Sequence, residues 1–472
     1  MENTERIWDI HDPHIFRDDA TDSYYVYSTE GKIHKSKDLI HWMQVGTALK
    51  DFPKEATEWT GTTNLWAPDI IKVGKEYRLY CSNSAWGVRK SCIFLAVADR
   101  PEGPFRYRGI VVRSDDEHFP CNAIDANPVE EDGTGRQFMT YGSFWGGVYL
   151  IELNPETGLA KEGPDVFGRC IAARPDWMDA AIEGPYIRYN KATGYYYLFV
   201  SYGSLLSDYN IRVGRSREIT GPYVDLEGRD LAVPNWNNAL DVERSGIFGN
   251  PDYPGTCIDP NNEIGYLLCA SYIYENRDSH WHGIMGPGHN SVLEDSDGSW
   301  YLIHHARPLH YTHGVPSFMQ VRKMFWMENG WPVVAPVAYN GDEQLAVAPP
   351  TKKVYEYGRA EVGMEDVAGI YRYLELKPES PQLAKPMSEM ILYPDGTAYY
   401  ARTIRYTWTM ENVTELTTPV VQGTIARLKL SSIGHSFEAY LMRGYDAVLD
   451  CETVYFSGMS SRGCGVWGVK LP

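Results

Sequence analysis

The amino-acid sequence predicts an all-β protein, a five-bladed β-propeller followed by a small antiparallel β-barrel or β-sandwich. Three observations predict this class. The composition is rich in Tyr (34) and Trp (14), which favour strands, and in Gly (43) and Pro (29), which favour turns. Helical periodicity is almost absent along the chain. Polar or acidic residues also open successive strands at a regular interval.

Short apolar runs separated by turn signals define the predicted strands. Examples are "SYYVYS", "YRLYCSN", "IFLAVAD", "YYYLFVSY" and "SWYLIHHA". Turn signals recur about every eight to twelve residues, which is typical of a sandwich, barrel or propeller. At 472 residues, with 43% hydrophobic and 22% charged residues, the chain is a folded globular protein too long for one ordinary core.

A repeat in the strand openings distinguishes the propeller from the other all-β folds. Asp12 in "HDPHI", Asp69 in "WAPDI", Asp125 in "AIDANPV" and Glu183 in "IEGPYI" are 57, 56 and 58 residues apart. This interval fits a four-stranded propeller blade. A fifth opening, at His289 in "GPGHNSV", follows a longer gap rich in Asn, Asp and Pro, from about residue 226 to residue 285, which we interpret as a loop insertion. Five blades would occupy residues 1–345.

The chain changes character after the fifth repeat. Residues 346–360 contain "PPTKKVYEYGR" and are expected to form a polar linker. Residues 361–472 alternate apolar and polar residues in short strands, and "YPDGTAYY" contains an Asp-Gly pair that favours a tight hairpin turn. This part is therefore expected to be a small antiparallel barrel or sandwich.

Charge and cysteine content exclude several classes of function. The formal net charge of −18 and the lack of a basic cluster argue against nucleic acid and against an anionic membrane surface as partners. No segment is apolar enough for a membrane span, and no signal peptide is visible at the start of the sequence. The eight cysteines have no C-x-x-C spacing, so buried free thiols are expected rather than a zinc cluster; Cys81 and Cys92 could lie on neighbouring strands.

The acidic strand openings are candidate catalytic residues because of where a propeller would place them. Strands that open a blade lie innermost, so Asp12, Asp125 and Glu183 would converge at one end of the central channel. Hydrolysis of a glycosidic bond needs two carboxyl groups that face each other. The alternative is that each carboxylate caps its strand and forms a turn, which we prefer for Asp69.

Eight motifs in order resemble glycoside hydrolase family 43, in particular the arabinanases that cleave α-1,5-linked arabinan. They are "HDPHI", "LWAPDI", "NAIDANPV", "YGSFWGGVYLIEL", "IEGPYI…YYYLFVSYGS", "RVGRSREITGPYVD", "GPGHNSV" and "QVRKMFWMENGWP". Together they extend across nearly all of residues 1–340. The C-terminal "VYFSGMSSRGCGVWGVKL" is similar to the ancillary β-barrel of the two-domain endo-arabinanases.

The resemblance implies a five-bladed propeller, an inverting mechanism and a role for each carboxylate. Asp12 would be the general base and Glu183 the general acid. Asp125 would be the third carboxylate, which raises the pKa of the acid and orients the substrate. The sequence differs from the family in Ala126, because arabinanases more often have proline directly after this aspartate.

The resemblance also implies a metal ion at His289, held mostly through water molecules. We expect calcium, or another hard cation such as sodium, because hard cations suit an acidic channel. The alternative is that His289 is an ordinary buried histidine whose hydrogen bonds are made within the core. His304, His305, His310 and His313 are expected to be a strand end and a solvated loop rather than a transition-metal site.

Four further residues are candidates for contact with a sugar. Trp86 and Trp145 present aromatic faces on which a sugar ring can stack, although core packing explains a tryptophan equally well. Ser143 and Arg322 are polar candidates, and Arg322 could instead be a structural ion-pair partner.

The leading functional hypothesis is an endo-acting α-1,5-L-arabinanase that binds arabinan or arabino-oligosaccharides as a monomer. An exo-arabinanase, an α-L-arabinofuranosidase or a β-xylosidase of the same family would use the same three carboxylates. A non-catalytic carbohydrate-binding propeller is the alternative from another class. A polymeric substrate implies an extracellular or periplasmic location.

Overall fold

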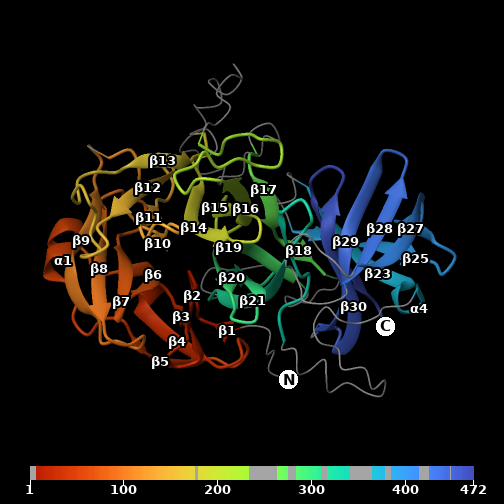
Figure 1. The fold of residues 1–472 in the computed structure, drawn as a ribbon, viewed down its shortest axis with the longest axis horizontal. Coiled ribbons are helices and arrows are strands. Elements are labelled where there is room, and N and C mark those ends of the chain that lie inside the picture. The colour runs from red at the N-terminus through yellow and green to blue at the C-terminus, as the bar shows by residue number, and fades with distance from the viewer. Residues whose placement is uncertain are drawn as a thin grey trace.

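The computed structural model describes most of the chain as a propeller joined to a barrel (Figure 1). The described residues are 7–117, 119–175, 179–232, 263–274, 283–309, 316–340, 364–377, 384–413, 425–446 and 448–472. The predicted linker, residues 346–360, and most of the predicted loop insertion lie outside them. Among the described residues, helices are confined to α1 (Lys54–Thr60), α4 (Met364–Val367) and the 3-10 turn η1 (Thr29–Gly31), and none of these is long and apolar enough to cross a membrane.

Four of the blades are four-stranded antiparallel sheets in chain order, as the repeat predicts. Blade 1 consists of β2 (His14–Asp18), β3 (Ser23–Tyr27), β4 (Lys32–Ser36) and β5 (Met43–Thr47). Blade 2 consists of β6 (Leu65–Val73), β7 (Glu76–Asn83), β8 (Ser91–Ala98) and β9 (Arg106–Ser114). Blade 3 consists of β10 (Asn127–Glu130), β11 (Gln137–Tyr141), β12 (Val148–Leu153) and β13 (Arg169–Ala172). Blade 4 consists of β14 (Ile182–Asn190), β15 (Tyr195–Tyr202), β16 (Asn210–Ser216) and β17 (Tyr266–Cys269).

Blade 5 closes the propeller with strands from three parts of the chain. It contains β18 (Tyr272–Ile273), β19 (Gly283–Glu294), β20 (Trp300–Arg307), β21 (Phe318–Trp326) and β22 (Pro332–Val334). The N-terminal strand β1 (Ile7–Trp8) pairs with β21, and β24 (Lys385–Pro386) pairs in parallel with β18. The inner strands β2, β6, β10, β14 and β19 contact one another in sequence and surround the central axis. The starts of these strands therefore lie together at one face.

The C-terminal part is a barrel rather than a sandwich, which resolves the alternative that the sequence left open. The described strands β23 (Gly369–Leu376), β25 (Ser388–Leu392), β26 (Thr397–Tyr400), β27 (Ile404–Val413), β28 (Ile425–Ser432), β29 (His435–Asp446), β30 (Cys451–Ser460) and β31 (Gly465–Lys470) close on themselves, since β23 also pairs with β31. Closure leaves no free sheet edge. The predicted "YPDG" turn connects β25 to β26.

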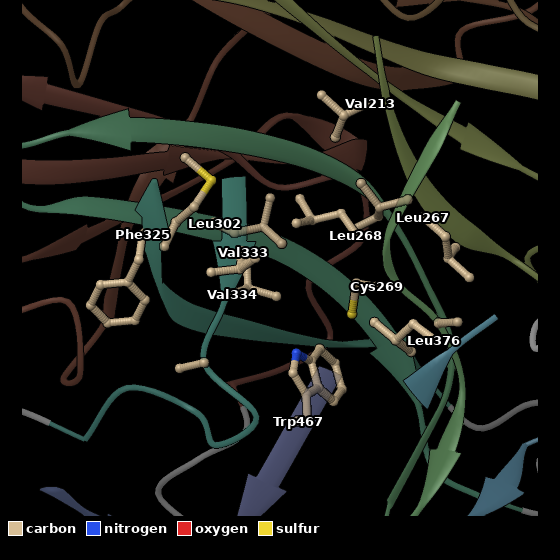
Figure 2. Packing of buried hydrophobic residues seen from close by; sticks show 14 of the residues in the cluster. Val213, Leu267, Leu268, Cys269, Leu302, Phe325, Val333, Val334, Leu376 and Trp467 are labelled. Carbon is tan, nitrogen blue, oxygen red and sulfur yellow. The ribbon is translucent and has the colours of Figure 1, made fainter. Parts of the chain in front are cut away.

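The barrel and the propeller share one hydrophobic core. Trp467 on β31 packs in the same cluster as Leu302, Val333 and Val334 of blade 5 and Leu267 of blade 4 (Figure 2). Hydrogen bonds cross the same boundary, from the Ser457 hydroxyl to the Val334 carbonyl (2.7 Å) and from the Tyr440 hydroxyl to the Trp326 carbonyl (3.2 Å). The barrel is thus packed against blades 4 and 5, on the side of the propeller away from blade 2 (Figure 1).

The described cysteines are free thiols. Cys81 and Cys92 lie on the neighbouring strands β7 and β8, as anticipated, but each is buried and unpaired in register: Cys81 faces Phe94, and Cys92 faces Asn83. Burial raises the pKa of the Cys92 thiol to about 12, so it is unreactive at neutral pH.

Candidate active site

A cleft of about 1140 Å³ lies over the starts of the inner strands and brings together the four residues predicted to meet there. Asp12 precedes β2, Asp125 precedes β10, Glu183 is in β14 and His289 is in β19. All four line the cleft although the chain separates the first from the last by 277 positions. The propeller therefore collects three carboxylates and one imidazole from four blades.

The backbone holds three of these residues in an unusual conformation. Asp12, Asp125 and His289 have φ angles of 54°, 61° and 46°, in the left-handed region that is strained for most side chains. Each backbone N–H donates to a side chain on the second strand of the preceding blade. The acceptor is Ser82 for Asp125 (2.9 Å), Ser201 for His289 (2.7 Å) and Nδ1 of His305 for Asp12 (3.1 Å). These bonds compensate the strain and fix where each side chain leaves the backbone.

Asp12 is surrounded by donors and imidazoles that favour its charged form. Its Oδ2 accepts a hydrogen bond of 2.5 Å from the Thr29 hydroxyl, and its Oδ1 lies 3.0 Å from Nδ1 of His289 and 3.4 Å from Nε2 of His11. Burial opposes ionisation, but His11 and His289 outweigh it and hold the pKa of Asp12 well below its usual value. Asp12 is therefore a carboxylate at neutral pH, as a general base must be.

Glu183 is the carboxyl group with the opposite tendency. Its Oε1 accepts from the Tyr209 hydroxyl and its Oε2 from the Ser143 hydroxyl, each at 2.7 Å. Burial raises the pKa of Glu183, and the attraction of His289 and these two hydrogen bonds only partly offset it. A carboxyl group that keeps its proton above the usual pH is suited to act as a general acid.

Asp125 is connected to the acid through the backbone. Its Oδ2 accepts a hydrogen bond of 3.1 Å from the N–H of Gly184, the residue after Glu183. Burial raises the pKa of Asp125, and the charges of Glu183 and Asp12 add to that rise. Burial is thus the main reason that the pKa values of both carboxyl groups are raised, and nearby negative charge adds to it.

His289 is a candidate ligand for a cation. Its Nδ1 is engaged with Asp12, whereas Nε2 is buried and has no hydrogen-bond partner in the described part of the chain. Burial alone would lower the pKa of His289, but Asp12, Asp125 and Glu183 raise it to about 10. The negative charge that favours a proton on His289 also favours a metal cation in place of that proton, so an imidazole with an unpartnered Nε2 among three carboxyl groups fits the expected ion.

Two further histidines of the tract lie near the end of a strand, as expected, but they are not solvated. His304 and His305 are buried in β20, and His305 meets Asp12. His11, Asp12 and His305 lie close enough together to suggest a metal site. However, Nδ1 of His305 already accepts the Asp12 N–H, so the nitrogen that faces Asp12 has no lone pair to give. His310 and His313 lie outside the described residues.

Asp69 is buried and structural, but it lies within β6 and does not cap the start of that strand. Its Oδ2 accepts a hydrogen bond of 2.7 Å from the Asn127 side chain, and its Oδ1 lies 3.5 Å from Nδ1 of His14. His14 and Asn127 each stand two residues after Asp12 and Asp125. Asp69 thus belongs to a second layer along the axis, below the cleft.

Three of the four predicted sugar-contacting residues line the cleft. Trp86 is 77% exposed and Trp145 is 37% exposed, so both present aromatic surface to a ligand. Ser143 lines the cleft, but its hydroxyl is committed to Glu183. Sequence reasoning missed Trp66 at the start of β6, which also lines the cleft and stands in the same "LWAPDI" motif as Asp69. It also missed Tyr209, because no local sequence pattern predicts its contact with Glu183.

Arg322 is not where the sequence interpretation placed it, and its assignment to sugar binding is corrected. The side chain is fully buried within blade 5, away from the cleft. Its guanidinium donates to the carbonyls of Ala335 (3.0 Å) and Pro336 (2.8 Å) and to the Tyr272 hydroxyl (2.9 Å). Arg322 therefore secures the segment that follows β22.

Comparison with known proteins agrees with this geometry. Residues 7–246 match the sequence profile of the glycosyl hydrolases family 43, and residues 350–468 match a C-terminal lipocalin-like domain. An extracellular endo-α-(1→5)-L-arabinanase 2 of Bacillus subtilis is 30% identical over 98% of this chain and 92% of its own length. The chain belongs to glycosyl hydrolase family 43. It is thus a glycoside hydrolase.

Solved structures of family 43 members share the same architecture. The endo-1,5-α-L-arabinanase of Thermotoga petrophila RKU-1 superposes with a TM-score of 0.77 at 25% identity, over 99% of both chains. The α-L-arabinanase of Cellvibrio cellulosa, solved in complex with arabinohexaose, matches 69% of this chain and 95% of its own with a TM-score of 0.54 at 30% identity. The propeller and the barrel therefore both have counterparts in the family.

Proposed function

We propose that this family 43 enzyme hydrolyses internal α-1,5-L-arabinofuranosidic bonds of arabinan by an inverting acid/base mechanism. The observation that supports it most is a pair of carboxyl groups in one cleft whose surroundings shift their pKa values in opposite directions. The imidazole neighbours of Asp12 lower its pKa, and burial raises the pKa of Glu183. The arabinanase names of the relatives indicate the substrate.

Each carboxyl group has a distinct part in the proposed reaction. Glu183 donates its proton to the glycosidic oxygen as the bond to the leaving sugar breaks. Asp12 removes a proton from a water molecule that attacks the anomeric carbon from the opposite face, which inverts its configuration. Asp125 touches neither reacting atom, but it fixes the backbone beside Glu183 and favours the protonated acid.

The proposal includes one cation, calcium or another hard ion such as sodium, at Nε2 of His289. When bound, such an ion supplies positive charge that stabilises the ionised base and the polarised water network. His289 itself orients Asp12 through its Nδ1, 3.0 Å from Oδ1. The argument for the ion is the buried, unpartnered nitrogen among carboxylates.

The shape of the cleft favours action within a chain. Its lining extends over blades 1 to 5, from Thr29 and Trp66 to Trp86 and on to Trp145, which gives room for sugars on both sides of the catalytic residues. Polymeric arabinan implies secretion, as for the extracellular relative, and we expect the enzyme to act as a monomer.

The test is a time course on debranched linear arabinan, with product sizes followed by chromatography and the Asp12→Ala variant in parallel. A ladder of arabino-oligosaccharides from the wild type and none from the variant is expected. Release of arabinose alone from the first minutes would indicate an exo-acting enzyme. Binding of arabinan without hydrolysis by the wild type would indicate a carbohydrate-binding propeller.

A further inference from the structure

A second cavity of about 500 Å³ adjoins the catalytic cleft over blades 1 and 2. Thr29 and Trp66 line both spaces, so the two adjoin at these residues. The second cavity extends outward from them to the loop after β5 and the loop before β6. Neither the acid nor the third carboxylate lines it, so it is not a part of the reacting centre.

The walls of this cavity combine neutral polar groups with an aromatic surface. Thr47, Thr63 and Asn64 are exposed and offer hydroxyl and amide groups, and Phe52 contributes a partly exposed ring. The charged residues are one lysine and one glutamate, which give no net charge. A ligand with several hydroxyl groups and a flat apolar face matches these walls, whereas a phosphate or a cation does not.

The connection to the base gives the cavity its significance. The Thr29 hydroxyl donates 2.5 Å to Oδ2 of Asp12 and stands at the junction of the two spaces. We propose that the second cavity binds a further arabinofuranosyl unit of the same substrate molecule, past Trp66. The inference rests on the proposed function. The unit has two possible sources: the next sugar of the main chain, or a side branch on the sugar at Trp66.

The test fills the cavity with Thr63→Trp and uses Thr403→Trp, on an exposed turn of the barrel, as the matched control. Initial rates are measured on linear arabino-oligosaccharides of increasing length and on branched arabinan. Filling the cavity is expected to lower kcat/KM about tenfold. If the unit belongs to the main chain, the loss begins at one oligosaccharide length. If the unit is a branch, the loss is confined to branched arabinan.

Two outcomes separate this proposal from the proposed function. Equal kcat/KM of Thr63→Trp and Thr403→Trp on all of these substrates, with an active wild type, would overturn the second cavity as a subsite. A wild type that hydrolyses no arabinan would instead overturn the proposed function.

A different observation, a stack of three aromatic rings, supports a second inference. The rings of His11 and His305 are 4.3 Å apart at an angle of 11°, and those of His305 and Tyr209 are 5.7 Å apart at 20°. One end of the stack adjoins the base, since Nε2 of His11 lies 3.4 Å from Oδ1 of Asp12, and the middle ring, His305, accepts the Asp12 N–H. The other end contacts the acid, since Tyr209 donates to Glu183. The stack therefore bridges the two carboxyl groups of the reaction.

Two features distinguish this stack from the anchors of the other blades. Blades 2 and 4 use the small residues Ser82 and Ser201 to anchor the equivalent backbone N–H groups, whereas blade 5 uses His305. The ring of Tyr209 packs directly on the backbone of Gly288, where a Cβ atom would lie 2.0 Å from the ring. We infer that His305 and Tyr209 are positioning residues that set the placement of the base relative to the acid.

The test of this inference compares two substrates, one whose leaving group needs protonation by the acid and one whose leaving group does not. Tyr209→Phe keeps the ring and removes the hydroxyl, so Glu183 loses one of the two bonds that orient it. Turnover of arabinan is expected to fall about 10- to 100-fold, the usual effect of a hydrogen bond to an ionisable group. Turnover of a 4-nitrophenyl arabino-oligosaccharide, whose leaving group needs no acid, should be unchanged. Tyr223→Phe, which removes a buried hydroxyl bonded to the Ile219 carbonyl, is the control.

His305→Ser gives the complementary result. A serine restores the arrangement of blades 2 and 4 but removes the ring, so the base loses its support while the acid keeps Tyr209. Both substrates are expected to lose kcat by similar factors with KM nearly unchanged, and the melting temperature should fall because the removed ring is buried. Equal losses on both substrates for Tyr209→Phe, or no loss for either variant, would contradict the inference.

Discussion

Nδ1 of His289 lies 3.0 Å from Oδ1 of Asp12, and both residues have left-handed backbones, Asp12 just before β2 and His289 within the adjacent inner strand β19. This contact joins the first and the last blade at the reacting centre. The contact favours the ionised form of Asp12. It also leaves Nε2 of His289 available for the proposed cation. The base and the proposed cation site are therefore one unit, which closure of the propeller assembles.

Removal of either proposed catalytic group is expected to abolish turnover with little effect on binding. Asp12→Asn and Glu183→Gln keep the shape of each side chain but remove the base and the acid, each of which contributes about 10²- to 10⁴-fold to the rate. Turnover is measured on arabinan, and binding by calorimetry with an arabino-oligosaccharide. Asp297→Asn, on the exposed β19–β20 turn, is the control and should have wild-type activity. Substantial hydrolysis by Glu183→Gln would refute its role as the acid.

The pH profile of kcat/KM is expected to be asymmetric. The pKa of Asp12 lies well below its usual value, so the base stays ionised and activity persists far into the acidic range. The pKa of Glu183 is raised, so activity falls only as the pH rises through that value and the acid loses its proton. Asp125→Asn removes a like charge beside the acid and should move this alkaline limb to lower pH. A limb that stays in place or moves upward would contradict the coupling.

Removal of the proposed cation is expected to lower both activity and melting temperature. A chelator that takes the ion from the folded enzyme removes its binding free energy from the stability of the native state. The wild type should therefore show a lower melting temperature after treatment with a strong chelator, restored by added calcium. His289→Gln should melt at the same temperature with and without chelator. A wild type that ignores chelation would argue against a tightly held ion.

Much of the fold was predictable because the blade is a repeated unit. The spacing of Asp12, Asp125 and Glu183 predicted the inner strands, and the structure confirms five blades. The repeat was less informative about the depth of each residue along the axis. Asp69 fits the spacing, yet it lies level with His14, which stands two residues after Asp12. Closure of blade 5 by β1 was not predictable, because a two-residue strand has no pattern of its own.

The site was predictable where a motif gives chemistry and not where it depends on contacts between distant residues. Strand openings that converge on an axis predicted the meeting of the carboxylates. No sequence signal joins Tyr209 to Glu183, or His305 to Asp12 across 293 positions. For Arg322 the prediction from residue type was wrong. Its guanidinium could bind a sugar, but in the fold it donates to backbone carbonyls instead.

Trp86 is expected to contribute to substrate affinity without contributing to stability. Its side chain is 77% exposed in the cleft, so truncation leaves no internal cavity. Trp86→Ala should raise KM for arabinan about three- to tenfold, as expected for the loss of a stacking surface, while kcat and the melting temperature remain near wild type. Tyr393→Ala, which removes an aromatic ring 42% exposed on the barrel, should leave KM unchanged. An unchanged KM in Trp86→Ala would exclude it as a sugar platform.

The shared core predicts that the propeller and the barrel unfold together. Trp467 is 1% exposed and lies between the two, with the Arg322 guanidinium 5.6 Å from its ring. Trp467→Ala should cost about 3–5 kcal/mol of unfolding free energy, because it opens a cavity in that core. Trp408→Ala, a buried tryptophan of the barrel interior, is the comparison. In calorimetry both variants should shift one common transition to lower temperature. Two separate transitions in the wild type, with only one displaced, would mean that the barrel folds independently and merely rests on blades 4 and 5.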